Sequence, residues 1–269
     1  MMSTPDSEPL AGRVALVAGA SRGIGAVTAG AFAGAGAAVV IAARDADALE
    51  KVAAGIRERG GQALAVPADV ADEASVRKLV DQAVRSFGRL DAAFNNVSAG
   101  PLPAPLADID PEEFDQGIRA NIRGTFLGMK YEIQAMLTTG SGGAIVNMAS
   151  VAGVQGVANL AAYVAGKAGI IGLTKVAALD YADQGIRVNV VAPGPIRTYH
   201  IEAAGEEAQR QAALSAPMRR MGEAREVAAA VLWLCSPQSA FITGATLPLD
   251  GGQTAGFRPP QMYRQGEPM

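Results

Sequence analysis

The chain has 269 residues, of which 49 % are hydrophobic and 18 % are charged, so it can bury a large core within one α/β domain. Its net charge is −3 and its basic residues are scattered, which disfavours nucleic acid as a partner. No uncharged apolar run approaches the roughly 20 residues that span a bilayer, so no membrane partner is expected. One histidine and one cysteine supply too few ligands for a His- or Cys-based metal site, and no metal is expected.

Short apolar runs alternate with longer amphipathic stretches along the chain. In chain order, we expect a strand at 13–18, a helix at 23–34, a strand at 37–42, a helix at 45–59, a strand at 62–66, a helix at 72–87, a strand at 91–94, a long helix at 111–137, a strand at 144–148, a helix at 161–182, a strand at 187–191, a weakly patterned helical region at 199–216, a helix at 223–235 and a strand at 246–249. This alternation predicts an α/β fold with a doubly wound parallel sheet of about seven strands and helices on both faces.

The two ends of the chain are expected to be tails around a single domain at 11–255. Residues 1–10 lack the basic start and apolar stretch of a secretory signal, and they are predicted to be disordered. Residues 256–269 are predicted to be a second tail, either disordered or packed on a neighbouring subunit. The lone cysteine, Cys235, lies in an apolar helical run and is expected to be buried. A single cysteine is compatible with a cytoplasmic location, which we expect.

A glycine-rich turn joins the first predicted strand to the first predicted helix. It contains Gly19, Ser21, Arg22, Gly23, Ile24 and Gly25. Glycines allow a sharp turn and a close approach of the backbone to a pyrophosphate, and the helix N-terminus then offers free N–H groups to the phosphates. A chance cluster among the chain's 32 glycines is the alternative, but the strand–turn–helix context favours a dinucleotide site and hence a Rossmann fold.

Cofactor choice is expected to be decided at the end of the second predicted strand. NAD enzymes place an acid there to bind the ribose 2′-hydroxyl, and Ala43 stands in that place. Arg44 follows it and Arg22 lies in the glycine-rich turn, so two guanidinium groups favour the 2′-phosphate of NADP(H) over NAD(H). Asp45 would partly offset them. Alternatively, both arginines are solvated surface charges and the cofactor is NAD(H).

Tyr163 and Lys167 stand four residues apart near the start of a predicted helix, so they project from the same face. A nearby ammonium favours the phenolate form of a tyrosine, which makes the tyrosine a usable proton donor and acceptor. Ser150 follows the strand predicted at 144–148, and Asn95 follows the one at 91–94. Ligands of open α/β sheets bind at the carboxyl edge of the strands, so these side chains are expected at one site.

Together these features resemble the single-domain branch of the short-chain dehydrogenase/reductase family, over about Leu10 to Gly252. The resemblance is carried by Gly19, Gly23, Gly25, Asp69, Val70, Asn95, Asn96, Asn121, Ser150, Tyr163, Lys167, Pro193 and Gly194. The ordered set is far more specific than any one of its members. One departure is Val97-Ser98, where the family usually has Ala-Gly.

The resemblance implies four catalytic residues. Tyr163 would be the general acid/base, and Lys167 would favour its phenolate form and hold the nicotinamide ribose. Ser150 would bind the substrate oxygen, and Asn121 would hold a water that links Lys167 to solvent. Local interpretations exist for two of them: Ser150 as a turn or helix cap and Asn121 as a helix-kink residue.

The resemblance also implies contacts to the cofactor beyond the glycine-rich turn. Asp69 and Val70 would contact the adenine, and Asn95 would lie beside the adenosine ribose. The nicotinamide carboxamide would be positioned by the segment after the sixth strand, through Pro193, Gly194, Ile196 and Thr198. Asp69 is alternatively an ordinary loop acid.

The expected function is hydride transfer between NADP(H) and the ketone or secondary alcohol of a small, hydrophobic molecule. An NAD-dependent alcohol dehydrogenase, a non-catalytic dinucleotide-binding protein and a lyase or epimerase on the same fold are the alternatives. The expected substrate wall comprises 101–106, 151–155 and 199–221, where His200 is either a lid residue or a substrate contact. Apolar residues on several faces of the two long helices either pack inside the protein or meet another subunit, and the resemblance implies the latter, in a homotetramer or homodimer.

Overall fold

The computed structural model describes residues 8–96, 102–140 and 142–256. Seven parallel strands form one sheet in the order β3-β2-β1-β4-β5-β6-β9. Their bounds are β1 (Val14–Ala18), β2 (Ala38–Ala43), β3 (Ala63–Pro67), β4 (Ala92–Asn95), β5 (Gly143–Met148), β6 (Ile186–Pro193) and β9 (Thr246–Leu249). The strand order reverses beside β1, where doubly wound sheets bind ligands, so the expected Rossmann fold is confirmed.

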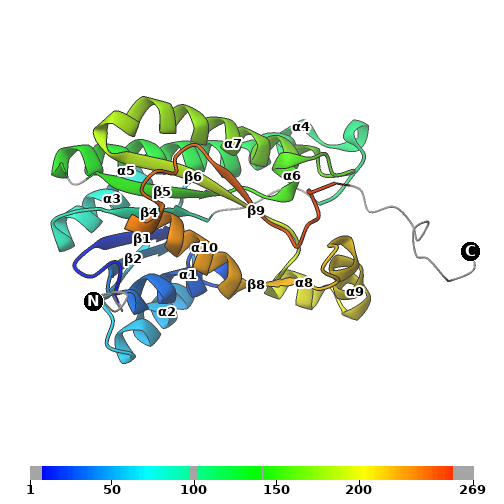
Figure 1. Cartoon of the computed structure of the whole chain (residues 1–269). Helices are drawn as coiled ribbons and strands as arrows, with labels where there is room; N and C mark the ends of the chain where they lie inside the picture. Colours follow the sequence, from blue (N-terminus) through cyan, green and yellow to red (C-terminus); the bar gives the residue numbers. More distant parts are fainter. Residues whose placement is uncertain (1–7, 97–101, 141, 257–269) are drawn as a thin grey trace, which may run out of the picture.

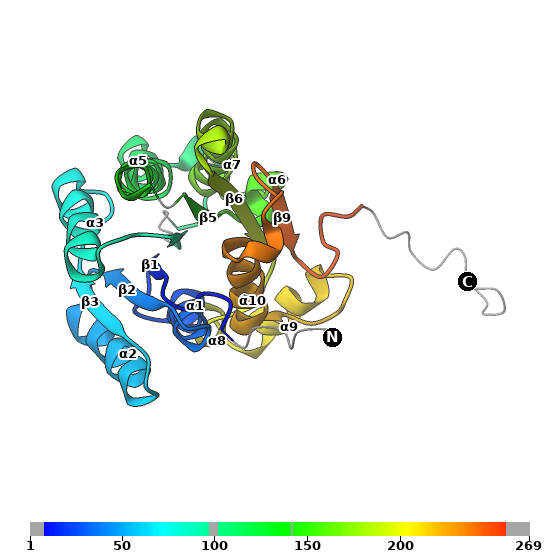
Figure 2. The same cartoon turned by 60° about the vertical axis from the view of Figure 1, so that its left-hand side comes forward.

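Long helices cover both faces of the sheet (Figure 2). On one face lie α1 (Gly23–Gly34), α2 (Ala46–Glu58) and α10 (Ala224–Cys235), and on the other α3 (Glu73–Phe87), α5 (Gly124–Thr139) and α7 (Ala161–Tyr181). Shorter elements are η1 (Leu106–Asp108), α4 (Pro111–Ile118), η2 (Arg119–Arg123), α6 (Val151–Val154), η3 (Ala182–Gln184), β7 (Ile196–Arg197), α8 (Tyr199–Ala203), α9 (Glu206–Ser215), β8 (Gly222–Glu223) and η4 (Pro237–Ser239). Among these, α6 follows β5, and α8 and α9 follow β6 and β7 (Figure 1).

The sheet divides the interior into two cores, one under each helical layer. Val17 of β1 belongs to the core that contains Phe32 of α1, whereas Leu16 belongs to the core that contains Ile133 of α5. Successive side chains of a strand point to opposite faces, so a strand covered on both sides must be apolar throughout. All five residues of β1 are buried, as this requires.

The structure differs from the sequence-based expectation in three places. The helix expected at 111–137 is interrupted by the π-helical turn η2. The sequence did not predict this turn, because one extra residue per turn leaves no clear mark on an apolar pattern. Leu10, expected in a disordered tail, is fully buried, and its N–H donates to the Ala35 carbonyl at 2.9 Å. The short parallel pair of β7 with β8 was not expected.

The stretch Ala161–Gln184, which contains α7, has 24 residues and a mean hydropathy of 1.3, enough by length and composition to cross a membrane. It packs against α4, α6 and β6, and its buried residues include Lys167 and Thr174. Core helices of layered proteins are apolar because the sheet and the neighbouring helices cover them. The composition of this helix is therefore explained by its place in the fold.

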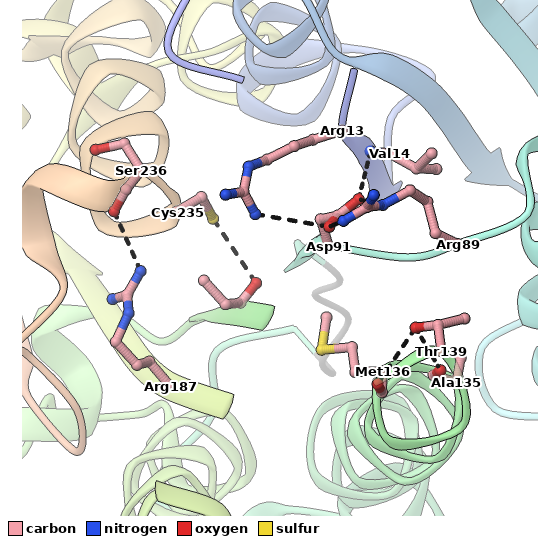
Figure 3. A network of polar contacts seen from close by, with 11 residues as sticks. Arg13, Val14, Arg89, Asp91, Ala135, Met136, Thr139, Arg187, Cys235 and Ser236 are labelled. Carbon is pink, nitrogen blue, oxygen red and sulfur yellow. Dashed lines mark hydrogen bonds and ion pairs between the residues drawn. The ribbon is translucent and has the colours of Figure 1, made fainter. Parts of the chain in front are cut away.

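At the amino edge of the sheet, a buried carboxylate joins β1 to β4 (Figure 3). Asp91 is 2 % exposed and accepts hydrogen bonds from the Val14 N–H at 2.9 Å and from Arg89 Nε at 2.8 Å. Arg13 lies 3.6 Å from the same carboxylate. The nearby Cys235 is buried as expected, and burial raises the pKa of its thiol to about 12, so this thiol is not reactive at neutral pH.

Replacing Asp91 with alanine is expected to lower the free energy of unfolding by about 1–3 kcal/mol, because the Val14 N–H and two half-exposed arginines lose their acceptor. Asp91→Asn keeps an acceptor oxygen and should lose less. Urea denaturation of the three proteins measures the difference, and cofactor binding below the transition should be unchanged. Equal stability of all three would contradict this account of the edge.

Candidate active site

The glycine-rich turn is shaped by close backbone contacts that exclude side chains. A Cβ at Gly19 would collide with the Asn96 carbonyl, and a Cβ at Gly25 would collide with the Gly19 carbonyl. The Asn96 side chain donates to that same Gly19 carbonyl at 3.1 Å, which fixes the turn against β4. Gly23 has a φ of +57° and open space where a Cβ would stand. The turn therefore leaves the N-terminus of α1 approachable by a phosphate group.

Two exposed arginines flank this turn. Arg22 is the N-cap residue of α1, but its side chain makes no capping hydrogen bond, and Arg44 follows β2. Within the described residues, neither guanidinium has a hydrogen-bond or ion-pair partner of its own. Asp45 lies beside Arg44, and its carboxylate accepts from the Ala48 N–H at 3.0 Å as the N-cap of α2. The acid expected to offset the arginines is therefore engaged with the helix backbone.

Asp69 and Val70 follow β3 at the same edge. Asp69 is exposed, and one of its carboxylate oxygens accepts from the Ala71 N–H at 2.9 Å, so the local interpretation as a loop acid describes one of its contacts. Val70 is half-buried against Gly124, where an added Cβ would come within 3.1 Å of a Val70 methyl carbon. The structure thus places the pair beside the N-terminus of α5.

Tyr163 and Lys167 lie on one face of α7, with Lys167 Nζ 5.6 Å from the centre of the Tyr163 ring. Lys167 is fully buried, and its Nζ donates to the Met148 carbonyl of β5 at 3.0 Å. Burial lowers the pKa of this ammonium to about 7. The side chain can therefore exchange its proton near neutral pH while remaining in a fixed position.

Helix α7 approaches its neighbours closely because glycines stand at the contacts. A Cβ at Gly153 of α6 would lie 2.7 Å from the Lys167 backbone, and one at Gly166 would lie 2.9 Å from Asn121 Cβ. Asn121 sits in the π-helical turn η2, is fully buried, and donates through Nδ2 to the Gly117 carbonyl at 2.9 Å. Asn121 thus lies in an irregular helical turn and packs beside the helix that carries Lys167.

Ser150 ends the chain segment that leaves β5 and is the N-cap residue of α6. Its Oγ accepts from the Ala152 N–H at 3.2 Å, so the cap that the sequence allowed is present. A hydroxyl that accepts a hydrogen bond still has its own proton to donate. Capping α6 therefore orients the Ser150 hydroxyl without removing its ability to bind a substrate oxygen.

The segment after β6 turns sharply at Gly194, whose N–H donates to the Leu249 carbonyl of β9 at 3.1 Å. A Cβ at Gly194 would lie 2.9 Å from Asp250 Cα, so only glycine fits. Pro193 and Ile196 are buried, and Thr198 is the N-cap residue of α8. The predicted contacts to a nicotinamide therefore start from a rigid backbone.

Asn95, expected beside the adenosine ribose, turns its side chain into the protein. It is 4 % exposed and donates through Nδ2 to Glu132 Oε2 and to Asn147 Oδ1, each at 3.0 Å. Any contact of Asn95 with a cofactor would therefore use its main chain. Glu132 and Asn147 were not predicted as site residues. Their polar side chains within the apolar runs of α5 and β5 could have indicated a buried polar network.

Some of the expected substrate wall lies outside the described residues. That part of the wall is Pro101. Val97-Ser98, which departs from the family pattern, and the tail that contains Phe257 and Tyr263 also lie outside the described residues. His200 falls within α8, but its side chain is also outside what the structure describes. Among the described residues, no group of three or more histidine, cysteine or acidic side chains is placed to hold a metal ion.

Comparison with known proteins places this site in a family. Residues 19–254 match the family described as Enoyl-(Acyl carrier protein) reductase. The chain is 42 % identical to the 2,5-dichloro-2,5-cyclohexadiene-1,4-diol dehydrogenase of Sphingobium indicum over 249 residues, covering 91 % of this chain and 98 % of that protein. It is 41 % identical to the cyclohexanol dehydrogenase of an Acinetobacter species over 243 residues, covering 90 % and 95 %.

A solved structure of levodione reductase superposes with a TM-score of 0.89 and 35 % identity, covering 92 % of this chain and all of the other. Its likeness extends the sequence match to the whole sheet and the helices on both faces. These relatives, together with a levodione reductase of Leifsonia aquatica, are named as dehydrogenases and reductases of alcohols and ketones. The chain belongs to the short-chain dehydrogenase/reductase family, whose members are NAD(P)-dependent oxidoreductases acting on CH–OH groups.

Proposed function

We propose that this enzyme transfers a hydride between NADP(H) and the ketone or secondary alcohol of a small, apolar, cyclic molecule. The observation that carries the proposal is the buried Lys167, held 3.0 Å from the Met148 carbonyl and beside Tyr163. A buried ammonium with a lowered pKa is costly for stability and is typical of catalytic sites. It lies at the carboxyl edge of a doubly wound sheet, where such folds bind dinucleotides.

The residues at this edge fit a dinucleotide. Gly19 and Gly25 keep side chains out of the turn, and the α1 N-terminus provides free N–H groups for a pyrophosphate. We infer that Arg22 and Arg44 bind a 2′-phosphate, because both are exposed cations without partners among the described residues. When bound, the nicotinamide supplies the hydride donor or acceptor.

The protein's own part in the chemistry is proton transfer and orientation. In the reductive direction, the Tyr163 hydroxyl would donate a proton to the substrate oxygen, and in the oxidative direction the phenolate would accept it. The Ser150 hydroxyl would donate a hydrogen bond to the same oxygen and stabilise its developing negative charge. Lys167 would hold the nicotinamide ribose beside Tyr163, and Asn121 would hold the water through which Lys167 exchanges its proton with solvent.

The substrate class follows from relatives and from the site's surroundings. Two of the relatives are named for a cyclohexanol and a cyclohexadiene diol. In this chain, Val154 and Val157 follow Ser150 and are 46 % and 36 % exposed, and Tyr199 at the start of α8 is 65 % exposed. Such exposed apolar residues on segments that follow β5 and β6 suit a ring ketone or ring alcohol better than a charged substrate. An NAD-dependent alcohol dehydrogenase of the same fold remains the second candidate, distinguished by cofactor preference.

We further propose that residues 11–255 act as one catalytic domain and that the enzyme assembles as a dimer or tetramer. The outer faces of α5 and α7 expose apolar side chains, including Phe126 at 45 %, Val176 at 56 % and Leu179 at 83 %. Exposed apolar residues on two neighbouring helices favour burial against another copy.

Tyr163→Phe is expected to lower turnover by at least about 100-fold, because it removes the proton donor without removing the ring. NADPH affinity, followed by nicotinamide fluorescence, should change less than about twofold. The assay is reduction of cyclohexanone. Unchanged turnover in this variant would refute the acid/base assignment.

Arg44→Ala is expected to weaken NADPH binding by roughly tenfold while leaving NADH binding almost unchanged, because only NADPH carries the 2′-phosphate. Lys51→Ala removes an exposed cation from the following helix and serves as the control. A protein that binds NADH better than NADPH, with no effect of Arg44→Ala, would instead support the NAD-dependent alternative.

The buried Lys167 also predicts a pH dependence of stability. Its pKa is lowered from 10.5 to about 7 in the folded protein, so between these values the unfolded chain binds more protons than the folded one. The free energy of unfolding should therefore rise with pH from 7 to 9, and Lys167→Met should flatten that rise. Urea denaturation without cofactor measures it, with Lys175→Met on the exposed side of α7 as the control. Parallel curves for wild type and Lys167→Met would contradict the lowered pKa.

A further inference from the structure

A chain of buried polar side chains runs beneath the site, from α5 through β4 and β5 to α7. Glu132 Oε2 accepts from Asn95 Nδ2 at 3.0 Å, and the same Asn95 amide donates to Asn147 Oδ1 at 3.0 Å. Asn147 Nδ2 then donates to Thr174 Oγ1 at 3.0 Å, and Thr174 donates to the Ile170 carbonyl at 2.8 Å. The four residues of this polar chain are each at most 4 % exposed. They are Glu132, Asn95, Asn147 and Thr174.

The far end of this polar chain meets the catalytic helix. Asn147 directly precedes Met148, whose carbonyl accepts from Lys167 Nζ at 3.0 Å. Thr174 lies on α7, the helix that carries Tyr163 and Lys167. Strand β5 and helix α7 are thus joined at two points: the Asn147 side chain binds Thr174, and the Met148 carbonyl binds Lys167. Two such contacts fix both the distance and the rotation of the helix relative to the strand.

The near end is packed as closely as the far end. A Cβ at Gly128 of α5 would lie 2.6 Å from Asn95 Oδ1, so the helix backbone touches the amide directly. Met129 of α5 lies on the Asn147 amide, with Nδ2 to Sδ at 3.1 Å. Glu132 is one helical turn further along the same face. The orientation of both asparagine amides is therefore determined by contacts with α5.

We propose that Glu132 is a positioning residue for the reaction, acting through Asn95 and Asn147 to hold the Met148 carbonyl and Lys167 in their working arrangement. This inference rests on the proposed function, since it assigns Glu132 a part in the same catalytic site. Glu132 touches neither Tyr163 nor Ser150 in the described contacts, so its effect is indirect. The Glu132 carboxyl is a hydrogen-bond acceptor and so directs the Asn95 amide. An apolar side chain at this position would not hold the amide in one orientation.

The burial of an acid at this place is otherwise unfavourable. Burial raises the pKa of the Glu132 carboxyl to about 7, and the hydrogen bond from Asn95 opposes that rise. An apolar residue of similar size would pack in the same layer without this desolvation cost. A buried chain of hydrogen bonds instead favours one arrangement of the elements that it joins.

The test compares three substitutions on α5. Glu132→Met removes the acceptor and keeps the length of the side chain, whereas Glu132→Gln keeps an acceptor oxygen. Ile133→Ala is the matched control, because Ile133 is 5 % exposed, is the next residue of α5, and lies outside the polar chain. It should lower the thermal transition of the protein without touching the asparagine amides.

In steady-state reduction of cyclohexanone, Glu132→Met is expected to lower kcat about tenfold with KM for NADPH changed less than about twofold, because misplaced catalytic groups slow the chemical step. Glu132→Gln should restore kcat to within about threefold of wild type. Ile133→Ala should keep the wild-type kcat below its transition. Thr174→Val removes the acceptor at the other end of the chain and should lower kcat in the same direction if Glu132→Met fails to fold.

A second readout does not depend on turnover. The Cε signal of Lys167 in protein labelled with [13Cε]lysine, identified by its loss in Lys167→Met, reports the surroundings of that ammonium. Its titration midpoint should move by at least about half a pH unit in Glu132→Met and stay at the wild-type value in Glu132→Gln and Ile133→Ala.

The two readouts separate the two proposals. If wild type reduces no ring ketone, the proposed function fails, while the Lys167 titration still decides the role of Glu132. Wild-type kcat together with a wild-type Lys167 midpoint in Glu132→Met would overturn the positioning role. So would a Glu132→Gln variant as impaired as Glu132→Met, because the retained acceptor would then have no effect.

Discussion

The hydrogen bond from Lys167 Nζ to the Met148 carbonyl is the contact on which the site depends. An ammonium group is stable in the interior only where an oxygen replaces the water that it has lost. To supply that oxygen, α7 must lie close over the end of β5. In this position α7 also lies directly against α6 and η2, which is possible because Gly153 and Gly166 carry no Cβ at those contacts. The positions of Tyr163, Ser150 and Asn121 all follow from that one packing arrangement.

The same constraint explains the irregular turn before α5. Asn121 is fully buried against Gly166, and its Nδ2 donates to the Gly117 carbonyl, which lies in the preceding turn. A regular helix would carry that side chain to a different angle, so η2 sets Asn121 toward α7 at the cost of a regular hydrogen-bond ladder. The fold thus keeps the irregular turn η2 and the buried Lys167 close to each other, although each is unfavourable for stability.

Local sequence patterns were sufficient for much of this. The seven sheet strands, the α1 bounds and the β9 bounds could be predicted because buried parallel strands are continuously apolar and glycine marks the turns. Tyr163 and Lys167 could be paired because an i, i+4 spacing fixes their common face. Ser150 could be assigned to the same site because strand ends share one edge, whereas Asn121 was assigned to it only from the family resemblance.

Other features depend on pairs far apart in sequence and left no such mark. Glu132 and Asn95 meet across 37 residues, and Asn147 and Thr174 across 27, so no periodicity connects them. The burial of Leu10 depends on Ala35, and the parallel β7–β8 pair depends on a crossover connection through α8 and α9. A short stretch of sequence contains only one partner of each such pair, whereas the contact that stabilises this residue comes from the other partner.

Isotope transfer tests the central claim most directly. The enzyme would be incubated with cyclohexanone and NADPH that carries deuterium at the transferring C4 position, in ordinary water. The account predicts cyclohexanol with one deuterium on the carbinol carbon and none when the label is in the solvent instead, because the hydride passes directly and only the oxygen takes a proton from Tyr163. Carbinol deuterium that arises from labelled water, or none from labelled NADPH, would contradict the account.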